Sequence, residues 1–251
     1  MSVLSEKLIF KLKASSIHLA LSFLVFIVIL YFILFEWYPE PFFTAQGGWQ
    51  GIKIMAFVDL VLGPALTFIV FNHLKQKKEI IFDLSIVALV QVIALTWGGY
   101  NVYTQRPVAL VFWTSAFYTV TSADYEEQGI DSPDFARYGA NKPALIYSRP
   151  VLTELDIAES MKLTADQVPA YAQVLFYEPL TENISEIFKY NIDIDEVVYQ
   201  NVEMKARLLE VVGEDISKYN YIALNAKYQN MILILDDDGS LIGEVKAPYH
   251  G

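Results

Sequence analysis

The chain of 251 residues contains no cysteine, which excludes disulfides, thiolate metal sites and a cysteine nucleophile. Only three histidines occur (His18, His73 and His250), and they lie too far apart in sequence to predict a histidine metal cluster. The net charge of −11 leaves no excess of Lys and Arg for a nucleic-acid phosphate backbone. We therefore expect no metal, no other cofactor and no nucleic-acid partner.

Apolar residues, in contrast, are abundant and unevenly distributed. They make up 54% of the chain, and the mean hydropathy is +0.34, which is too high for an average soluble domain. Residues 1–99 have seven basic and six acidic side chains, whereas residues 100–251 have eleven basic and twenty-three acidic ones. Since all long apolar runs lie in the first half, we divide the chain near residue 100 into a membrane part and an acidic globular part.

Three apolar runs are long enough to cross a bilayer, at about residues 17–35, 52–72 and 80–100. The first carries no charge and spans ~28 Å as a helix, close to the hydrocarbon thickness. No small-x-small cleavage site follows it directly, so we expect a retained anchor rather than a cleaved signal peptide. The expected domains are an N-terminus at 1–16, a membrane domain with three transmembrane helices at 17–100, and an acidic domain at 101–251.

The lysines near the membrane predict the orientation of these helices. The loop at 36–51 has no Lys or Arg, so the loop lysines all fall on the opposite side, at Lys7, Lys11, Lys13, Lys75, Lys77 and Lys78. Positive charge marks the cytoplasmic side. We therefore expect a multi-pass protein of a bacterial inner membrane, with a cytoplasmic N-terminus and a periplasmic C-terminal domain.

The acidic half alternates strand-like and helix-like segments. Val108–Tyr118 is typical of a single buried strand, and Thr153 with Asp156 resembles a capping box that begins a helix. Near the C-terminus, Asn230–Leu235 and Leu241–Lys246 predict a hairpin around a turn of three aspartates and Gly239. The predicted fold class is a three-helix transmembrane bundle plus an α+β periplasmic domain on an antiparallel sheet.

Asp59 is the most informative polar residue in the apolar half. A charged carboxylate at that depth costs about 2.5–3.5 kcal/mol on insertion scales, so it needs a partner, water or a proton. Gly63-Pro64 follows it, and the proline frees a backbone carbonyl and favours a bend. Two interpretations stay open: Asp59 contacts a partner within the membrane, or it forms an internal pair with Lys53 or Gln91.

The remaining candidates have structural interpretations. Asp83 begins the third run close to the loop lysines, and a negative charge suits a helix N-terminus. The sequence has no phosphate-binding glycine loop and no nucleophile elbow, and His250 at the C-terminus is poorly placed for a catalytic base. We therefore expect that the protein is not an enzyme.

In several segments the sequence resembles the type IV pilin accessory proteins of the TfpX/TfpZ family. The resemblance rests on Asp59–Pro64, on Phe82–Leu84 followed by Gln91, on Arg106-Pro107 before an apolar strand, and on Tyr177–Pro179. Where the family pattern continues after Arg-Pro with an acidic, a basic and an aromatic residue, this chain has Thr114–Phe117 instead.

The resemblance implies an inner-membrane accessory factor for type IV pilus assembly. Its implied partner is the pilin subunit, which it would bind as a chaperone or as a modulator of assembly and retraction, beside other inner-membrane pilus assembly proteins and the lipid bilayer. The candidate partner-binding residues are Asp59, Gly63, Pro64, Gln91 and Arg106. The alternatives are a membrane sensor or signalling subunit with a periplasmic ligand-binding domain, and a membrane enzyme with periplasmic chemistry.

Overall fold

The computed structural model describes residues 3–38, 42–126, 133–139, 142–213 and 215–248. These residues form two compact units, which we call the helical unit and the sheet unit. The helical unit contains the described residues up to 43 together with 47–103, and the sheet unit contains 44–46 together with the chain from 104 onward.

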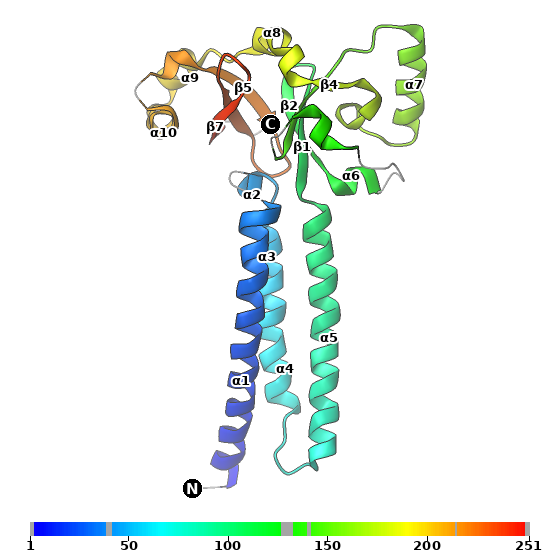
Figure 1. Cartoon of the computed structure of the whole chain (residues 1–251). Helices are drawn as coiled ribbons and strands as arrows, with labels where there is room; N and C mark the ends of the chain where they lie inside the picture. Colours follow the sequence, from blue (N-terminus) through cyan, green and yellow to red (C-terminus); the bar gives the residue numbers. More distant parts are fainter. Residues whose placement is uncertain (1–2, 39–41, 127–132, 140–141, 214, 249–251) are drawn as a thin grey trace. The chain divides into compact units, whose positions relative to one another are not determined.

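Three helical stretches build the helical unit, and each is long and apolar enough to cross a membrane (Figure 1). The first ends in a π-helical turn, the second contains such a turn in its middle, and the third is one continuous α-helix. Their parts are α1 (Val3–Tyr31), η1 (Phe32–Trp37), α3 (Gly48–Ala56), η2 (Phe57–Leu62), α4 (Gly63–Val70) and α5 (Lys77–Thr104), and a short α2 (Phe42–Ala45) precedes α3.

The helices extend beyond the apolar runs that predict them. Helix α1 begins at Val3 rather than near residue 17, and α5 covers Lys77–Thr104 rather than residues 80–100. The 28 residues of α5 are ~42 Å long, more than the ~30 Å of a hydrocarbon core. A helix satisfies its own backbone hydrogen bonds in water as well as in lipid, so hydropathy indicates the apolar part of each helix and not its ends.

A cluster of aromatic and aliphatic side chains holds the helices together at one end of the helical unit. Its buried members are Ile33, Tyr38, Phe43, Ile52 and Met55. The Tyr38 hydroxyl donates a hydrogen bond of 2.8 Å to the carbonyl of Val102, and the rings of Trp37 and Tyr103 meet edge to face at 5.2 Å. Because Val102 and Tyr103 lie in the last turn of α5, these contacts attach that end of α5 to the chain that follows α1.

The sheet unit contains a seven-stranded mixed sheet in the order β4-β3-β1-β2-β5-β6-β7. The strands are β1 (Pro107–Trp113), β2 (Ala116–Thr121), β3 (Ala144–Ser148), β4 (Tyr177–Pro179), β5 (Asn220–Asn225), β6 (Met231–Leu235) and β7 (Leu241–Lys246). The expectation of an antiparallel sheet is wrong for two of its neighbours, since β1 is parallel to β3 and β2 is parallel to β5. The parallel neighbours are not consecutive in the chain, since β2 lies between β1 and β3, and β3 and β4 lie between β2 and β5.

Helices and turns complete the two faces of this sheet. The α-helices are α6 (Ser122–Glu126), α7 (Glu154–Ala165), α8 (Ile184–Ile187), α9 (Ile194–Gln200) and α10 (Val202–Val212). The 3₁₀ turns are η3 (Phe135–Tyr138), η4 (Ala170–Ala172), η5 (Val174–Phe176), η6 (Leu180–Glu182), η7 (Phe188–Tyr190) and η8 (Ile216–Lys218). One core cluster surrounds β1 and β3, and a second joins α9 and α10 to β5, β6 and β7.

A buried pair of tyrosines lies in the first of these clusters. The hydroxyls of Tyr125 and Tyr177 are 3.0 Å apart, and the Tyr177 hydroxyl also donates to the carbonyl of Tyr171 at 2.9 Å. Burial raises the pKa of both Tyr125 and Tyr177, which keeps them neutral hydrogen-bonding groups of the core.

The segment predicted as one strand, Val108–Tyr118, is a hairpin. The chain reverses at Thr114 and Ser115 between β1 and β2, and the Ser115 N–H donates to the carbonyl of Trp113 at 2.7 Å. Thr114 adopts a left-handed conformation with a φ of 60°. The turn contains no Gly, Pro, Asn or Asp, which are the residues that signal such a reversal in a sequence.

Two other local predictions are confirmed. The Thr153 hydroxyl accepts the N–H of Asp156, and the Asp156 carboxylate accepts the N–H of Thr153, so the capping box of α7 is complete. Strands β6 and β7 pair antiparallel around the aspartate turn, in which the Asp236 carboxylate accepts the N–H groups of Asp238 and Ser240.

Thr114→Gly is expected to stabilise the sheet unit. A left-handed backbone costs a non-glycine residue about 1–2 kcal/mol, and a β-branched side chain adds crowding, so the free energy of unfolding rises by about 1 kcal/mol. Thermal unfolding of the purified protein in detergent measures this. The control is Ser115→Gly, because Ser115 does not have a positive φ and glycine there removes no backbone strain. It is expected to leave stability unchanged or to lower it. Equal effects of both substitutions would contradict the prediction.

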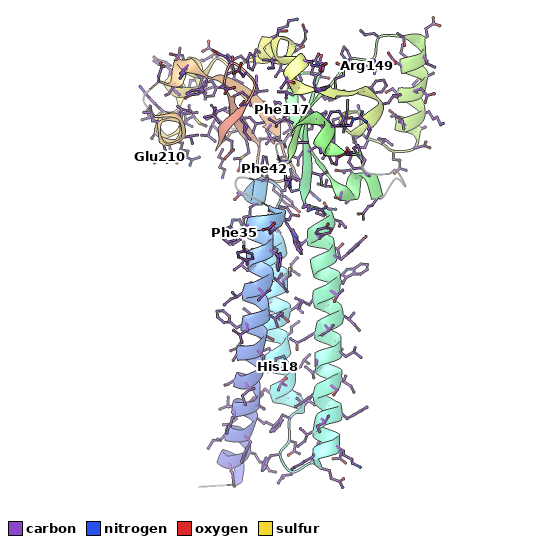
Figure 2. The ribbon with its side chains drawn as sticks, viewed as in Figure 1. His18, Phe35, Phe42, Phe117, Arg149 and Glu210 are labelled. Atoms are coloured by element: carbon purple, nitrogen blue, oxygen red, sulfur yellow. The ribbon has the colours of Figure 1, made fainter. Side chains whose placement is uncertain are left out.

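Acid is expected to weaken the attachment of α7. The guanidinium of Arg149, a residue labelled in Figure 2, donates two hydrogen bonds of 3.0 Å to the Asp156 carboxylate. Together with the Thr153 contacts, it holds the pKa of that carboxyl well below its usual range. Because the folded pKa lies below the unfolded one, this contribution is present at neutral pH and is lost as pH falls below about 4.

Asp156→Asn therefore lowers stability at neutral pH and flattens the loss of stability below about pH 4, as measured by thermal unfolding from pH 7 to pH 3. Arg149→Ala removes the same pair from its other side and is expected to flatten the same part of the curve. If neither substitution changes how stability depends on pH below about 4, the Arg149–Asp156 pair is not the cause of that dependence.

Candidate functional site

Asp59 lies in the π-helical turn η2, directly before the Gly63-Pro64 pair. In this turn the N–H of Gly63 donates to the carbonyl of Val58, five residues back. Pro64 has no N–H, so the regular hydrogen-bond ladder cannot pass through it unchanged. Single π turns are frequent at functional sites. The bend expected from Gly63-Pro64 thus coincides with a change of helix type around Asp59.

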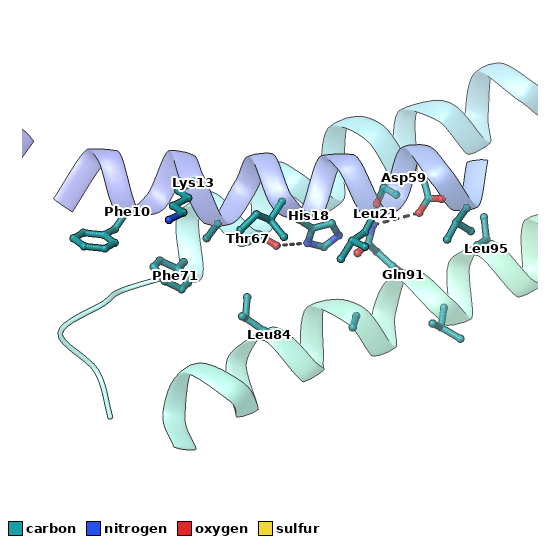
Figure 3. Close-up of a pocket in the computed structure, with 16 residues that line it drawn as sticks. Phe10, Lys13, His18, Leu21, Asp59, Thr67, Phe71, Leu84, Gln91 and Leu95 are labelled. Carbon is teal, nitrogen blue, oxygen red and sulfur yellow. Dashed lines mark hydrogen bonds between the residues drawn. The ribbon is translucent and has the colours of Figure 1, made fainter. Parts of the chain in front are cut away.

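Three of the residues singled out from the sequence come together here. The side-chain amide of Gln91 in α5 donates a hydrogen bond of 3.3 Å to one oxygen of Asp59 (Figure 3). A Cβ atom on Gly63 would lie only 2.0 Å from that amide nitrogen, so the absence of a side chain at Gly63 gives Gln91 its space. Of the two internal partners considered for Asp59, Gln91 is the one that binds it.

A second set of polar contacts joins α1 to α4. The Ser15 hydroxyl donates to the carbonyl of Pro64 at 2.8 Å, and His18 Nδ1 lies 2.5 Å from the hydroxyl oxygen of Thr67. These contacts were not anticipated from the sequence. The signal for them is a polar stripe on an otherwise apolar run, since Ser15, His18 and Ser22 recur at the spacing of one helix face.

A cavity of about 700 Å³ lies between α1, the η2–α4 stretch and α5. Its walls are mainly apolar, and its lining includes His18, Asp59, Thr67 and Gln91 (Figure 3). Asp59 is only 3% exposed, and its second carboxylate oxygen has no hydrogen-bond partner among the described residues. We call this space the interhelical cavity.

Arg106 is not part of this cavity. It lies between α5 and β1, is half-buried, and belongs to the sheet unit, whereas Asp59, Gly63, Pro64 and Gln91 belong to the helical unit. The five candidate residues therefore divide into a cluster of four within the bundle and one residue at the start of the sheet.

Basic residues gather at the far end of the bundle from the aromatic cluster. Lys75 forms a salt bridge of 2.5 Å with Asp83, which confirms the structural interpretation of that acid at the start of α5. The Lys11 ammonium donates to the carbonyl of Ile69 at 3.1 Å, and the rings of Phe10 and His73 stack at 4.7 Å. The lysines of the N-terminus and of the loop before α5 thus lie at the same end.

The chain resembles proteins named for fimbrial assembly. The family model for the fimbrial assembly protein FimB matches residues 6–47, which include Ser15 and His18 of the bundle contacts. The fimbrial assembly protein of serogroups C1 and C2 from Dichelobacter nodosus is 35% identical over 119 residues, which are 47% of this chain and 91% of the relative. The chain belongs to the fimbrial assembly protein FimB family.

Two other fimbrial assembly proteins from Dichelobacter nodosus that resemble the chain are longer. The fimbrial assembly protein of serogroup E1 is 36% identical over 119 residues, and that of serogroup I is 38% identical over 107 residues. The matched segment covers 46% and 42% of their lengths, so the chain spans less than half of each. No solved structure matches the chain at a significant level.

Gly63→Ala is expected to destabilise the helical unit. The new methyl group displaces the Gln91 amide and leaves Asp59 without its donor, at a cost of about 1–2 kcal/mol for a buried polar contact in lipid. The matched control is Gly99→Ala in α5, where a Cβ meets no atom within 4 Å and where alanine favours the helix.

Thermal unfolding in detergent is expected to give a lower midpoint for Gly63→Ala and an equal or higher one for Gly99→Ala. In a Gln91→Ala background the clash is absent, so the cost of Gly63→Ala is expected to disappear. A cost that persists in that background would show that Gln91 is not the cause.

Proposed function

We propose that this protein is an inner-membrane accessory factor for type IV pilus assembly that binds the pilin subunit. The observation that carries the proposal is the similarity to relatives named fimbrial assembly proteins, one of which it covers over 91% of its length. The motif resemblance to type IV pilin accessory proteins supports the more specific assignment to type IV pili. The proposed role is binding and handover, without catalysis.

The two units suit a partner that has a membrane helix and a head outside the membrane. A pilin subunit waits in the inner membrane as a single apolar helix with its head in the periplasm. The helical unit would contact the helix, and the sheet unit would contact the head. Two weak contacts joined in one molecule raise the overall affinity through effective concentration. The protein would then act as a pilin-specific chaperone or as a modulator of assembly and retraction.

The lysine end of the bundle supports a definite orientation for this role. Lys11 lies beside the last turn of α4, and Lys75 lies beside the first turns of α5, so both lysine groups occupy one end of the helices. Since basic residues favour the cytoplasmic side, the sheet unit would follow α5 into the periplasm, where pilin heads are found.

Deletion of the gene in its native host is expected to abolish surface pili, and a plasmid copy is expected to restore them. Surface pili and total pilin are measured with the retraction motor present and absent. Loss in both backgrounds, with pilin still in the membrane, indicates a role in assembly. Loss that disappears without the motor indicates a role against retraction, and falling pilin levels indicate a stabilising chaperone.

Normal pili and normal pilin in every background would overturn the proposal. The membrane-sensor hypothesis would then become the better one, and it requires a cytoplasmic partner at the lysine loop.

A further inference from the structure

The interhelical cavity contains one polar group whose hydrogen bonding is incomplete. Gln91 donates to one oxygen of Asp59, and the other oxygen is buried without a donor among the described residues. Asp59 contributes to the cavity wall, and a rotation of its carboxyl group would turn the buried second oxygen toward a molecule in the cavity. A buried carboxylate oxygen without a donor is costly, and in lipid there is little water to provide one. The cavity therefore favours an occupant that brings a hydrogen-bond donor.

The shape of the cavity favours an elongated occupant. Its lining on α1 runs from Phe10 to Val25, which is ~22 Å of helix, and on α5 it runs from Leu84 to Leu95, which is ~17 Å. The apolar wall is uncovered as well as long, because Ile17 is 55%, Leu21 60% and Val92 60% exposed. An apolar molecule that lies parallel to the helices fits such a wall.

We propose that one transmembrane helix, that of the pilin subunit, packs along the open side of the interhelical cavity with the side chains of one face inserted into it, and that one of these side chains presents a hydrogen-bond donor to the free oxygen of Asp59. The donor is an ammonium, guanidinium, amide or hydroxyl group on an otherwise apolar helix face. This inference rests on the proposed function and specifies where and by what chemistry the partner is held. Asp59 thus selects one register of the bound helix, since only one depth satisfies the carboxylate.

Two other occupants fit less well. A lipid acyl chain is apolar and elongated, but it carries no donor for Asp59. A second copy of this chain would have to insert one of its own helices, and each of these is already held within its own bundle, α1 and α4 through Ser15 and His18 and α5 through Gln91. A pilin helix is tethered only to its own head and has no such restriction.

Photo-crosslinking at two adjacent positions tests the location. A photoreactive phenylalanine analogue is placed at Val92, which lines the cavity, or at Ile93, which does not, in the full-length protein in its native host. Both side chains are 60% exposed, so general access to the membrane is equal. We expect the Val92 probe to give several times more pilin adduct than the Ile93 probe, because only the Val92 position faces a helix that is bound at the cavity.

Substitution of Asp59 tests the chemistry. Asp59→Leu removes the acceptor and is expected to lower the Val92 adduct about tenfold, whereas the control Asp83→Asn, at the lysine end, leaves it unchanged. The level of each variant in the membrane is measured in the same cells. Asp59→Leu also removes the acceptor of the Gln91 amide, so the isosteric Asp59→Asn, which can still accept that hydrogen bond, is tested beside it. For Asp59→Asn we expect a fall of about threefold from loss of the charge.

Equal pilin adducts at Val92 and Ile93 would overturn the location, and so would adducts at Val92 that contain only lipid or only a second copy of the protein. A Val92 adduct that Asp59→Leu and Asp59→Asn both leave unchanged would overturn the role of the carboxylate. The deletion strain separates these failures from failure of the proposed function. Lost pili without a cavity adduct refute only this inference, whereas normal pili refute the function itself.

Discussion

The contact between Asp59 and Gln91 constrains the whole helical unit. Apolar side chains gain little from packing against each other in place of lipid tails, so polar contacts and close approach determine how helices associate in a membrane. Here Gln91 fixes α5 against η2, and Ser15 and His18 fix α1 against α4. These contacts all fall within three turns of the second stretch. A shift of any helix by one turn would break them and leave polar groups in an apolar environment.

The interhelical cavity is a consequence of where these contacts lie. Helix α5 is held at its last turn, through the Tyr38 hydroxyl and the Trp37 ring, and again at Gln91 in its middle. Towards the lysine end, Leu84 and Ala88 face the cavity rather than the core of the bundle. The chain thus keeps two helices closely packed and holds the third by a few contacts, an arrangement that can receive a further helix without dismantling the bundle.

Part of this arrangement is visible in the sequence. Asp59, Gly63 and Gln91 stand out because a polar residue or a glycine next to proline in an apolar run has to be explained, and the structure brings them together. The Ser15 and His18 contacts were missed, because single polar residues near the end of an apolar run are ordinary and only their shared helix face marks them. The sequence indicates which groups require partners, but it does not indicate which helix provides them.

In the sheet unit, too, the sequence predicts local features but not which distant segments pair. The capping box of α7 and the β6–β7 hairpin are local, so neighbouring residues were enough to predict them. The β1–β2 hairpin contains none of the residues that usually signal a turn, although Thr114 adopts a left-handed backbone between two paired strands. Its reversal could therefore not be predicted from the local sequence. The parallel pairs β1–β3 and β2–β5 join segments far apart in sequence, and alternation within a strand carries no information on the direction of its neighbour.

A partner held at the interhelical cavity would be bound weakly, and weak binding suits an assembly factor. Single polar contacts between membrane helices contribute on average about 0.6 kcal/mol and at most about 2 kcal/mol, and apolar packing replaces lipid contacts of similar strength. A tight complex would keep a subunit from its fibre, whereas a few such contacts allow release. One buried carboxylate therefore contributes more to the choice of helix and register than to affinity, because a helix without a donor leaves Asp59 unsatisfied.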